Sequence, residues 1–428
     1  MSRYLRNAAV VLLVLFVSSA VFAGGGAEEA AEDGVVEIRW LQWWEQEWGP
    51  ELHASIIERF EEANPGIRVT VIDVPWPEMS PRLQAAAVGG ETYDIIGIER
   101  SWVSSLVAQD YIEDLGPWLE EDSEFRASLA EDAPWNFFGT TPGLALYLIP
   151  YQYAYNTTAF DEYGLEAPEN WEEFVSVLEA LRDEGVYGMS MPLSDPSFII
   201  TRLFGLRLAQ EGGSWFDDDG NVAFNSQAGV DALNWWKEFY EMDLIPDGAL
   251  TEDQATMLEF LAAEQIAGVI DGPFIQPKAE AINDDIQLAY APAWDLDTGG
   301  YSLSSSGLAI AAGSEHKEEA WLFLKHLYSE EIAVQMTQEV NLPWATNAAL
   351  EYIDEEGGDD PMLRYVPQYF TQDPANNIQE PMVPEADLLF TTFQTAFNEA
   401  ITGRTPVTQA LDEAAEVWQN AIDEYRGN

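Results

Sequence analysis

Residues 35–98 read VVEIRWLQWWEQEWGPELHASIIERFEEANPGIRVTVIDVPWPEMSPRLQAAAVGGETYDIIGI, and this stretch decides the fold. Short apolar or alternating runs typical of strands are separated by segments in which apolar residues recur at helical spacing. Asn64-Pro65-Gly66 and Gly89-Gly90 are stop signals for the helices. The pattern predicts strands at 35–40, 67–74 and 93–98 and helices at 52–63 and 80–88, with Pro81 in the first turn of the second helix. Alternating strands and helices indicate an α/β fold with parallel strand pairs.

The α/β pattern is interrupted after this stretch and resumes late in the chain. Residues 144–155 have strand character, and Asn170 is a plausible cap for a helix at 171–184. Further helices are expected at 226–240, 257–263 and 315–328, and further strands at 266–271, 286–291 and 307–311. With 47% apolar residues, the chain can build an ordinary core. We expect two domains, each assembled from non-contiguous segments.

The first 33 residues have the layout of an export signal followed by a tether. Arg3 and Arg6 precede an apolar run at 8–17, and Val21 and Ala23 are small residues at the two positions that a signal peptidase reads. We expect a signal peptide at 1–23, cleaved after Ala23, and a flexible tether at 24–33. The alternative is a retained anchor, but a spanning helix needs about 20 apolar residues. The mature chain is expected to be soluble and to act in the periplasm or on the extracellular face.

The charge balance is strongly acidic. The chain has 76 acidic residues against 18 basic ones, and removal of Arg3 and Arg6 leaves 18 − 2 = 16 basic residues. Phosphate backbones and anionic lipid surfaces require clustered Lys and Arg, so nucleic acid is not expected as a partner. The excess of acidic residues could indicate a cation-binding protein, or it could indicate a protein surface adapted to saline surroundings. Their spread along the whole chain favours the saline surface.

Motifs for catalysis and metal binding are missing from the sequence. The chain has no Cys, and its three His residues are scattered; it has no P-loop, no Gly-x-Ser-x-Gly and no His-Glu-x-x-His. Paired carboxylates could hydrolyse glycosides, but with 76 acidic residues such pairs are expected by chance. We therefore predict no catalytic residue, no metal ligand and no cofactor.

Aromatic residues lie where the predicted strands end. In open α/β sheets, ligands bind beyond the carboxyl ends of the strands. Flat aromatic faces suit the apolar face of a pyranose, and neighbouring polar groups can bind hydroxyls. The aromatic residues in such positions are Trp43, Trp44, Trp102, Tyr151 and Tyr153, with Trp294 and Trp344 in loops near the late strands. A second set is read as packing residues because it lies on helical repeats: Trp171, Trp235, Trp236, Trp321 and Trp418.

A series of short segments, in order, matches a known family. They are IRWLQWW (38–44), FEEANPGIRV (60–69), LQAA (83–86), YDII (93–96), GGSWF (212–216), FNS (224–226), VIDGPF (269–274), GLAI (307–310) and KEEAW (317–321). On these segments the chain resembles the extracellular solute-binding proteins of ABC importers, in the branch that includes maltose- and trehalose-binding proteins. The resemblance covers nearly all of the mature chain.

The resemblance implies two α/β lobes, each a mainly parallel sheet flanked by helices, with the ligand in the cleft between them. Mapped on this sequence, the N-terminal lobe would take 34–142 and 274–312, and the C-terminal lobe 143–273 and 313–428. Closure around the ligand would be a hinge motion that the importer recognises.

The resemblance also implies binding positions. They follow the first strand (Trp43, Trp44, Glu45), the third strand (Glu99, Trp102) and the Pro-Tyr pair (Tyr151, Gln152), and Arg82 matches a position that often reaches the sugar. Phe274 stands where an aromatic residue, more commonly Trp, often stacks on sugar. Ser304-Ser305-Ser306 replaces a usual Gly-Gly-Trp segment, which leaves Ser305 and Ser306 at the site. Trp294 and Trp344 complete the candidate set, Trp344 in a loop that could close over the site.

Three functions follow as hypotheses. The main one is a non-catalytic sugar receptor, monomeric, that serves the permease subunits of an ABC importer. A second is a receptor on the same fold for a cationic solute (an amine, peptide or metal), for which Glu45 and Glu99 would supply acidic groups. The third is a secreted glycosidase.

Overall fold

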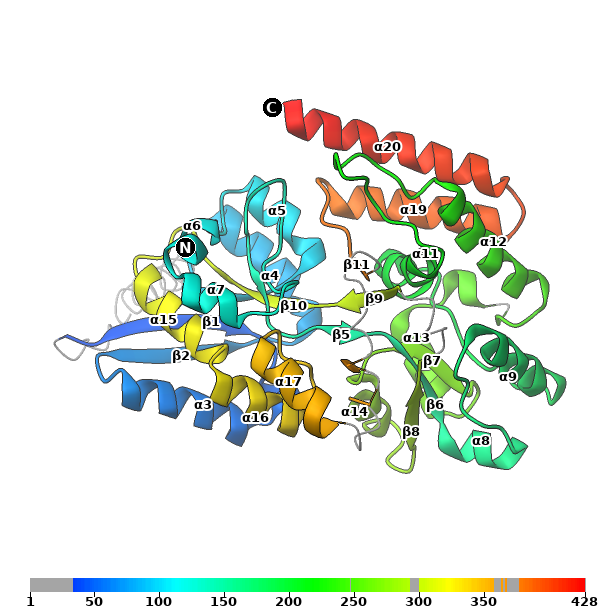
Figure 1. The fold of residues 1–428 in the computed structure, drawn as a ribbon, viewed down its shortest axis with the longest axis horizontal. Helices are drawn as coiled ribbons and strands as arrows, with labels where there is room; N and C mark the ends of the chain where they lie inside the picture. Colours follow the sequence, from blue (N-terminus) through cyan, green and yellow to red (C-terminus); the bar gives the residue numbers. More distant parts are fainter. Residues whose placement is uncertain are drawn as a thin grey trace, which may run out of the picture.

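The computed structural model describes residues 34–246, 248–292, 300–357, 363–364, 366–367 and 377–427. These residues form two lobes, which lie side by side in Figure 1. The predictions for 1–23 and 24–33 fall outside the described residues. Within the described part of the chain, no helix is both long and apolar enough to span a membrane.

The sheet of the first lobe has the strand order β2-β1-β3-β10-β4. Its strands are β1 (Val36–Gln42), β2 (Ile67–Asp73), β3 (Ile95–Glu99), β4 (Leu144–Ala145) and β10 (Ser306–Ile310). β1 pairs in parallel with both β2 and β3, whereas β10 pairs antiparallel with β3 and β4. The predicted α/β core with parallel pairs is therefore confirmed.

The helices that follow β1 and β2 pack on this sheet. They are α3 (Pro50–Ala63) and α4 (Trp76–Gly89). α4 begins earlier than expected, because Pro77 occupies its first turn, and Pro81 lies inside the helix.

The sheet of the second lobe has the order β7-β6-β8. Its strands are β6 (Gln152–Asn156), β7 (Gly268–Asp271) and β8 (Leu288–Ala291), and β6 pairs antiparallel with both neighbours. This differs from the expected mainly parallel sheet. β7 and β8 follow one another in the chain, joined through α14 (Ile275–Glu280), and lie on either side of β6. β6 enters from the first lobe in the opposite direction, so it is antiparallel to both.

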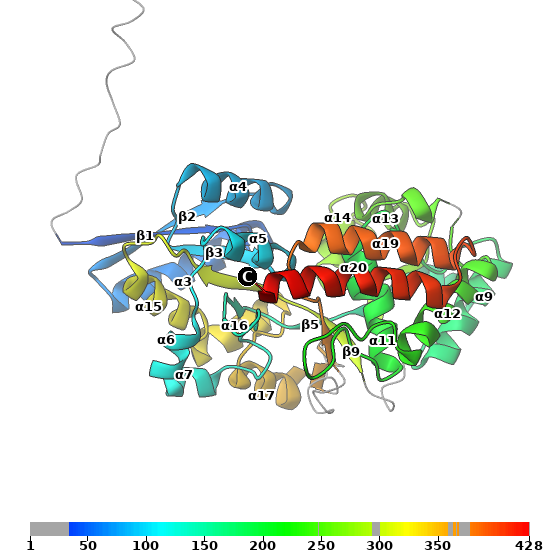
Figure 2. The ribbon, with the colours of Figure 1, turned by 90° about the horizontal axis from the view of Figure 1, so that it is seen from above.

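A small sheet lies where the chain passes between the lobes. It has the order β11-β9-β5, made of β5 (Ile149–Pro150), β9 (Tyr301–Ser304) and β11 (Asn377–Gln379). β5 runs on towards β6, and β9 runs on into β10, so both connect the lobes (Figures 1 and 2).

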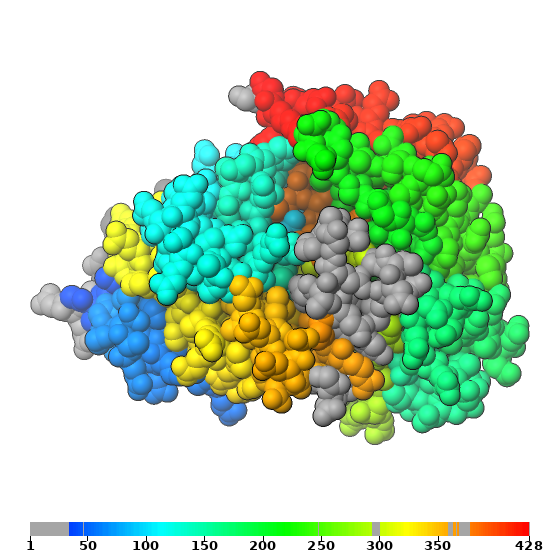
Figure 3. All heavy atoms as spheres, in the orientation of Figure 1, coloured from blue at the N-terminus to red at the C-terminus, as the bar shows by residue number. Residues whose placement is uncertain are grey.

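The described residues build two hydrophobic cores, one in each lobe. One core runs from Ile38 to Ile149 and includes Leu308 to Ala349; the other begins at Tyr151 and includes the C-terminal helices. The space-filling view shows the two halves side by side (Figure 3).

The cores divide the chain differently from the expected lobe boundaries. Ile275 and Tyr290 pack in the second core, although 274–312 was assigned to the first lobe. Trp321 and Met336 pack in the first core, although 313–428 was assigned to the second lobe. The reason is that β8 pairs with β6, whereas the helix after β10 folds back onto the sheet of which β10 is a part.

The remaining helices cover the sheets and the outer faces. They are α2 (Glu45–Trp48), α5 (Val103–Ala108), α6 (Gly116–Glu121), α7 (Ser123–Ser128), α8 (Thr157–Tyr163), α9 (Trp171–Asp183), α10 (Pro196–Phe198), α11 (Gly205–Gln210), α12 (Gln227–Glu241), α13 (Gln254–Ala262), α14 (Ile275–Glu280), α15 (Lys317–Leu327), α16 (Glu330–Val340), α17 (Asn347–Glu356), α19 (Ala386–Ile401) and α20 (Val407–Gly427), with 3₁₀ turns at Arg100–Trp102 and Ala249–Thr251 and a π-helical segment at Ile199–Phe204.

Two local predictions are confirmed. Asn170 caps α9, because its side chain accepts a hydrogen bond from the backbone N–H of Glu173. The tryptophans on helical repeats pack against the cores: Trp171, Trp236, Trp321 and Trp418 are buried, and Trp235 is partly buried against the second core.

Candidate functional site

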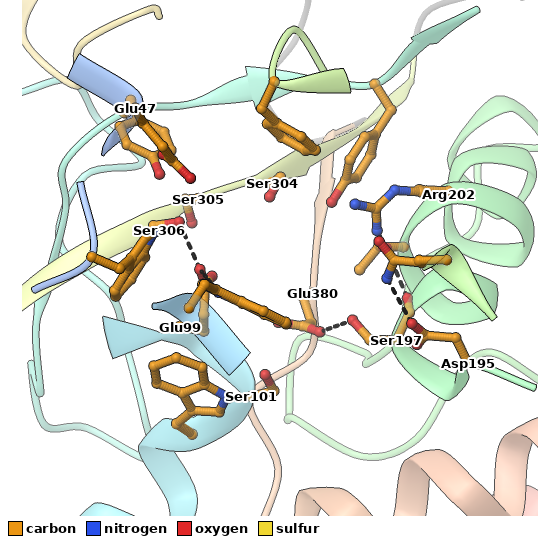
Figure 4. A pocket seen from close by; sticks show the side chains of 18 of the residues that line it. Glu47, Glu99, Ser101, Asp195, Ser197, Arg202, Ser304, Ser305, Ser306 and Glu380 are labelled. Atoms are coloured by element: carbon orange, nitrogen blue, oxygen red, sulfur yellow. Dashed lines mark hydrogen bonds between the residues drawn. The ribbon is translucent and has the colours of Figure 1, made fainter. Parts of the chain in front are cut away.

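A cavity of about 220 Å³ lies between the two lobes (Figure 4). Both lobes and the crossing strand β9 contribute to its walls. The described lining residues are Trp43, Glu47, Trp76, Glu99, Ser101, Trp102, Tyr147, Tyr151, Asp195, Ser197, Thr201, Arg202, Gln254, Phe274, Lys278, Ser304, Ser305, Ser306 and Glu380.

Tryptophans form one wall of the cavity. Trp43 follows β1, and its ring centroid lies 5.9 Å from that of Trp102, which in turn lies 6.1 Å from that of Trp76. Gly97 in β3 makes room for this arrangement, since a Cβ there would lie 2.8 Å from a ring carbon of Trp43. The sequence of β3 therefore allows an aromatic wall to lie directly against the sheet.

Glu99 is the last residue of β3 and points into the cavity beside these rings (Figure 4). Its Oε1 accepts hydrogen bonds from Ser306 Oγ at 2.8 Å and from Trp76 Nε1 at 3.2 Å. Burial raises the pKa of Glu99 to about 8, and the neighbouring negative charges of Glu380 and Glu47 act in the same direction. A carboxyl group in this environment can exchange a proton near neutral pH.

Arg202 forms the opposite side of the cavity. Its Nε donates to Asp271 Oδ1 at 3.0 Å, and its guanidinium carbon lies 4.4 Å from the ring centroid of Tyr151. Arg202 and Asp271 are both buried, so each neutralises the other away from water. The stacking on Tyr151 further fixes the plane of the guanidinium.

Further charged groups lie around the same cavity. Glu380 accepts a hydrogen bond from Ser197 Oγ at 2.7 Å, and burial raises its pKa. Burial also raises the pKa of Glu47, although the positive charge of Lys278 offsets part of that effect. The Nζ of Lys278 lies 4.6 Å from the ring centroid of Phe274.

The structure brings more than half of the residues predicted from the sequence into this cavity. Those that line it are Trp43, Glu99, Trp102, Tyr151, Phe274, Ser305 and Ser306. Those that lie among the described residues but outside the lining are Trp44, Glu45, Arg82, Gln152 and Trp344. Trp294 lies outside the described residues.

Trp44 and Trp344 are core residues. Trp44 stacks on Trp48 with ring centroids 5.3 Å apart and an interplanar angle of 8°, and its Nε1 donates to Tyr147 Oη at 3.1 Å. Trp344 is fully buried, and its Nε1 donates to the carbonyl oxygen of Leu327 at 2.8 Å. Each therefore packs beneath the site, and neither ring faces the cavity.

The polar residues outside the lining have other contacts. The exposed Arg82 donates through Nε to Tyr93 Oη at 2.9 Å, and the backbone N–H of Glu45 donates to Asp73 Oδ1 at 3.3 Å. Gln152 is buried in β6 opposite Asp271.

Sequence reasoning missed lining residues in both lobes and on the crossing strand β9. The missed residues are Glu47, Trp76, Ser101, Tyr147, Asp195, Ser197, Thr201, Arg202, Gln254, Lys278, Ser304 and Glu380. One signal was available for Arg202, which interrupts the apolar run FIITRLF at 198–204. Nothing comparable marks Glu380 among the many acidic residues of the chain.

The geometry suits a polar ligand with an apolar face. Rings from both lobes flank the cavity, and carboxylates, hydroxyls and cations lie between them. Among the described residues, no group of three or more His, Cys, Asp or Glu side chains could hold a metal ion.

Comparison with known proteins agrees with this architecture. The model of the family described as bacterial extracellular solute-binding protein matches residues 42–334, which is more than half of the chain. The chain belongs to this family. The solute-binding family accounts for the two lobes and for a cavity between them.

Individual relatives are distant. The mannitol-binding protein of Pseudomonas aeruginosa is 25% identical over 397 residues, covering 83% of this chain and 87% of its own. The galactooligosaccharide-binding protein of Bacillus subtilis is 21% identical over 439 residues, covering 97% of each chain. A solute-binding protein of an ABC transporter from Thermotoga lettingae, solved with α-D-tagatose bound, superposes with a TM-score of 0.71 at 21% identity over 90% of this chain and 100% of its own.

Proposed function

We propose that this solute-binding protein captures a small carbohydrate between its lobes and presents it to the permease subunits of an ABC importer. The observation that carries the proposal is the pairing of aromatic faces with hydrogen-bonding groups in one cavity. Trp43 and Trp102 offer flat apolar surfaces, and Ser305, Ser306 and Arg202 offer partners for hydroxyls. Carbohydrates have this combination of an apolar ring face and an equatorial rim of hydroxyls.

The size of the cavity supports a short ligand. Its volume of about 220 Å³ is smaller than the roughly 300–1,000 Å³ typical of sites for drug-sized molecules. The mannitol-binding relative and the tagatose-bound structure have names that refer to ligands of six carbons. A monosaccharide or a sugar alcohol is therefore our first choice, with a short oligosaccharide as the extension that the galactooligosaccharide-binding relative supports.

The crossing strands support a closing motion. β5 and β9 pair with each other between the lobes, so bending there would change the width of the cavity without disrupting either core. Ligand contacts to both lobes would stabilise the closed form, which the importer would then recognise.

The remaining parts of the proposal concern the compartment and the chemistry. We propose export by a signal peptide at 1–23, action as a monomer outside the cytoplasmic membrane, and no catalytic step. Membership in a family of binding proteins supports this non-catalytic role. The rival is a glycosidase that would use carboxyl groups such as Glu99 and Glu380.

Titration calorimetry of the mature protein with hexoses, hexitols and disaccharides tests the proposal. We expect saturable binding by at least one of them, and the recovered ligand should be unchanged after prolonged incubation. Trp102→Ala should weaken that binding by more than about tenfold, because a stacking ring is lost. Trp235→Ala is the matched control, since Trp235 lies on α12 away from the cavity. Absence of binding across the panel would refute the proposal, and product formation would favour the glycosidase.

A further inference from the structure

The charges around the cavity are unevenly paired. Among the described lining residues, the carboxylates are Glu47, Glu99, Asp195 and Glu380, and the cations are Arg202 and Lys278. Arg202 is held by Asp271 at 3.0 Å, and the Nζ of Lys278 lies 4.6 Å from the ring centroid of Phe274 and offsets part of the rise in the pKa of Glu47. Four lining carboxyl groups therefore face two lining cations, and the described effects of these cations fall on Asp271 and Glu47.

Glu99 is the carboxylate without a countercharge. Its hydrogen-bond donors, Ser306 and Trp76, are both neutral. The adjacent Arg100 turns away, because its Nε donates to the carbonyl oxygen of Glu380 at 2.9 Å and its guanidinium carbon lies 5.4 Å from the ring centroid of Trp135. The neighbouring charges that act on Glu99 are those of Glu380 and Glu47, which are also negative.

Several polar atoms of the cavity have no hydrogen-bond partner among the described residues, and two of them lie beside the tryptophan wall, on Glu99 and Ser305. Both donors to Glu99 contact Oε1, so no described donor contacts Oε2. Ser305 is buried, lines the cavity, and its Oγ has no hydrogen-bond partner among the described residues. Buried polar groups are normally satisfied, so Ser305 Oγ indicates where a ligand supplies a hydrogen bond, and Oε2 of the partly exposed Glu99 is open to a second one.

The rings beside Glu99 favour positive charge over a neutral donor. Trp76 contacts the carboxylate through its Nε1, and Trp102 and Trp43 continue the wall. Indole faces attract a cation that is partly removed from water, and a carboxylate beside them adds a charge-assisted hydrogen bond. Burial raises the pKa of Glu99 to about 8, so a cation bound at Oε2 would stabilise its ionised form, whereas a neutral hydroxyl would not.

We infer that the solute is an amino sugar whose protonated primary amine binds Oε2 of Glu99 within the tryptophan wall. The inference rests on the proposed function and narrows its substrate class. In this arrangement the sugar ring lies against Trp43 or Trp102, one hydroxyl bonds Ser305 Oγ, and others reach the polar side of the cavity at Arg202. Acetylation of the amine would remove the charge and add bulk beside the rings.

The test compares matched sugars on the mature protein by titration calorimetry at pH 7 and fixed, physiological salt. The probes are glucosamine, galactosamine and mannosamine, their parent hexoses, and their N-acetyl derivatives. We expect at least one amino sugar to bind about tenfold or more tightly than its parent hexose and its N-acetyl derivative, as a charge-assisted hydrogen bond implies.

A charge-neutral variant assigns the preference to Glu99. Glu99→Gln keeps the size of the side chain and an acceptor for Ser306 and Trp76, and it should bring amino sugar and parent hexose to within about twofold of each other. Glu51→Gln removes the same charge from the exposed first turn of α3 and should leave the preference unchanged. This control separates a local contact from general attraction by an acidic protein.

The outcomes separate a failure of the amino-sugar inference from a failure of the proposed sugar-binding function on which it rests. A neutral hexose or hexitol that binds as tightly as its amino counterpart would overturn the inference and leave sugar capture intact. Retention of the amine preference in Glu99→Gln would overturn the assignment to Glu99. If neither neutral nor amino sugars bind, the proposed function fails and the inference fails with it.

Discussion

Arg202 Nε lies 3.0 Å from Asp271 Oδ1, and this buried ion pair ties the π-helical segment of the second lobe to the end of β7. Asp271 also accepts a hydrogen bond from the backbone N–H of Gly272 at 2.8 Å. The pair thus fixes one wall of the cavity to the sheet behind it. Two charges at this depth stabilise the fold only while each compensates the other.

Asp271→Asn should strongly destabilise the protein. The change leaves the Arg202 guanidinium buried without a countercharge, and breaking a buried pair in this way costs about 3–5 kcal/mol. Urea unfolding followed by far-UV circular dichroism measures the loss. The exposed pair Lys237–Glu241 on α12 provides the control, since Glu241→Gln should cost less than about 1 kcal/mol. Equal effects at the two pairs would contradict the role given to Arg202 and Asp271.

Trp43 and Trp44 should differ in their effect on ligand binding. Trp43→Ala removes a cavity wall and should weaken ligand binding by more than about tenfold. Trp44→Ala creates a void under the site and should lower the free energy of unfolding by about 3–5 kcal/mol. Calorimetric titration and urea unfolding of both variants check the contrast. Wild-type affinity in Trp43→Ala would exclude that ring from the site.

Stability of the ligand-free protein should fall as the pH rises towards 8. Because the pKa of Glu99 is about 8 in the folded state, above its ordinary value of 4.5, the folded state binds more protons than the unfolded state between these values. The contribution of this group to stability is fully present below the lower pKa and is lost as the pH approaches the higher one. Its slope is at most about 1.4 kcal/mol per pH unit.

Glu99→Gln isolates that contribution. Glu47 and Glu380 also have raised pKa values and produce slopes of the same sign, so the wild-type slope should decrease in the variant without vanishing. Unfolding free energies measured at intervals between pH 5 and pH 9 provide the comparison. Identical pH profiles for the two proteins would show that Glu99 does not titrate in this range.

Low salt should destabilise the fold. The chain carries 76 acidic residues against 18 basic ones, so like charges repel across its surface, and salt screens that repulsion. The melting temperature should rise between low and molar sodium chloride. An unchanged melting temperature would show that repulsion between the acidic surface groups does not limit the stability of the fold.

Much of the first lobe can be predicted from sequence because its pattern is local. β1, β2 and β3 end within two residues of their predicted limits, since each is bounded by a helix or by Gly and Pro signals. The direction of β6 has no such signal. It depends on where the chain enters the second lobe, which is a tertiary property, and the antiparallel sheet was therefore missed.

The site was predictable only at the ends of strands. Trp43 and Trp102 follow β1 and β3, and Glu99 ends β3, so the rule for α/β sheets predicts a position beside the cavity for residues that do line it. Trp44 differs from Trp43 only in side-chain direction, which residue spacing does not reveal. Glu380 reaches the cavity from a part of the chain that is distant in sequence, and no local pattern marks it.

The division of each core among distant segments constrains the order in which the protein can fold. The first core needs Leu308 and Met336 as well as Ile38, so its sheet stays incomplete until most of the polypeptide has emerged from the ribosome. Domains that are contiguous in sequence can fold one after the other during synthesis, whereas these lobes cannot. Translation arrested before β10 should therefore yield a nascent chain that stays sensitive to protease along its whole length.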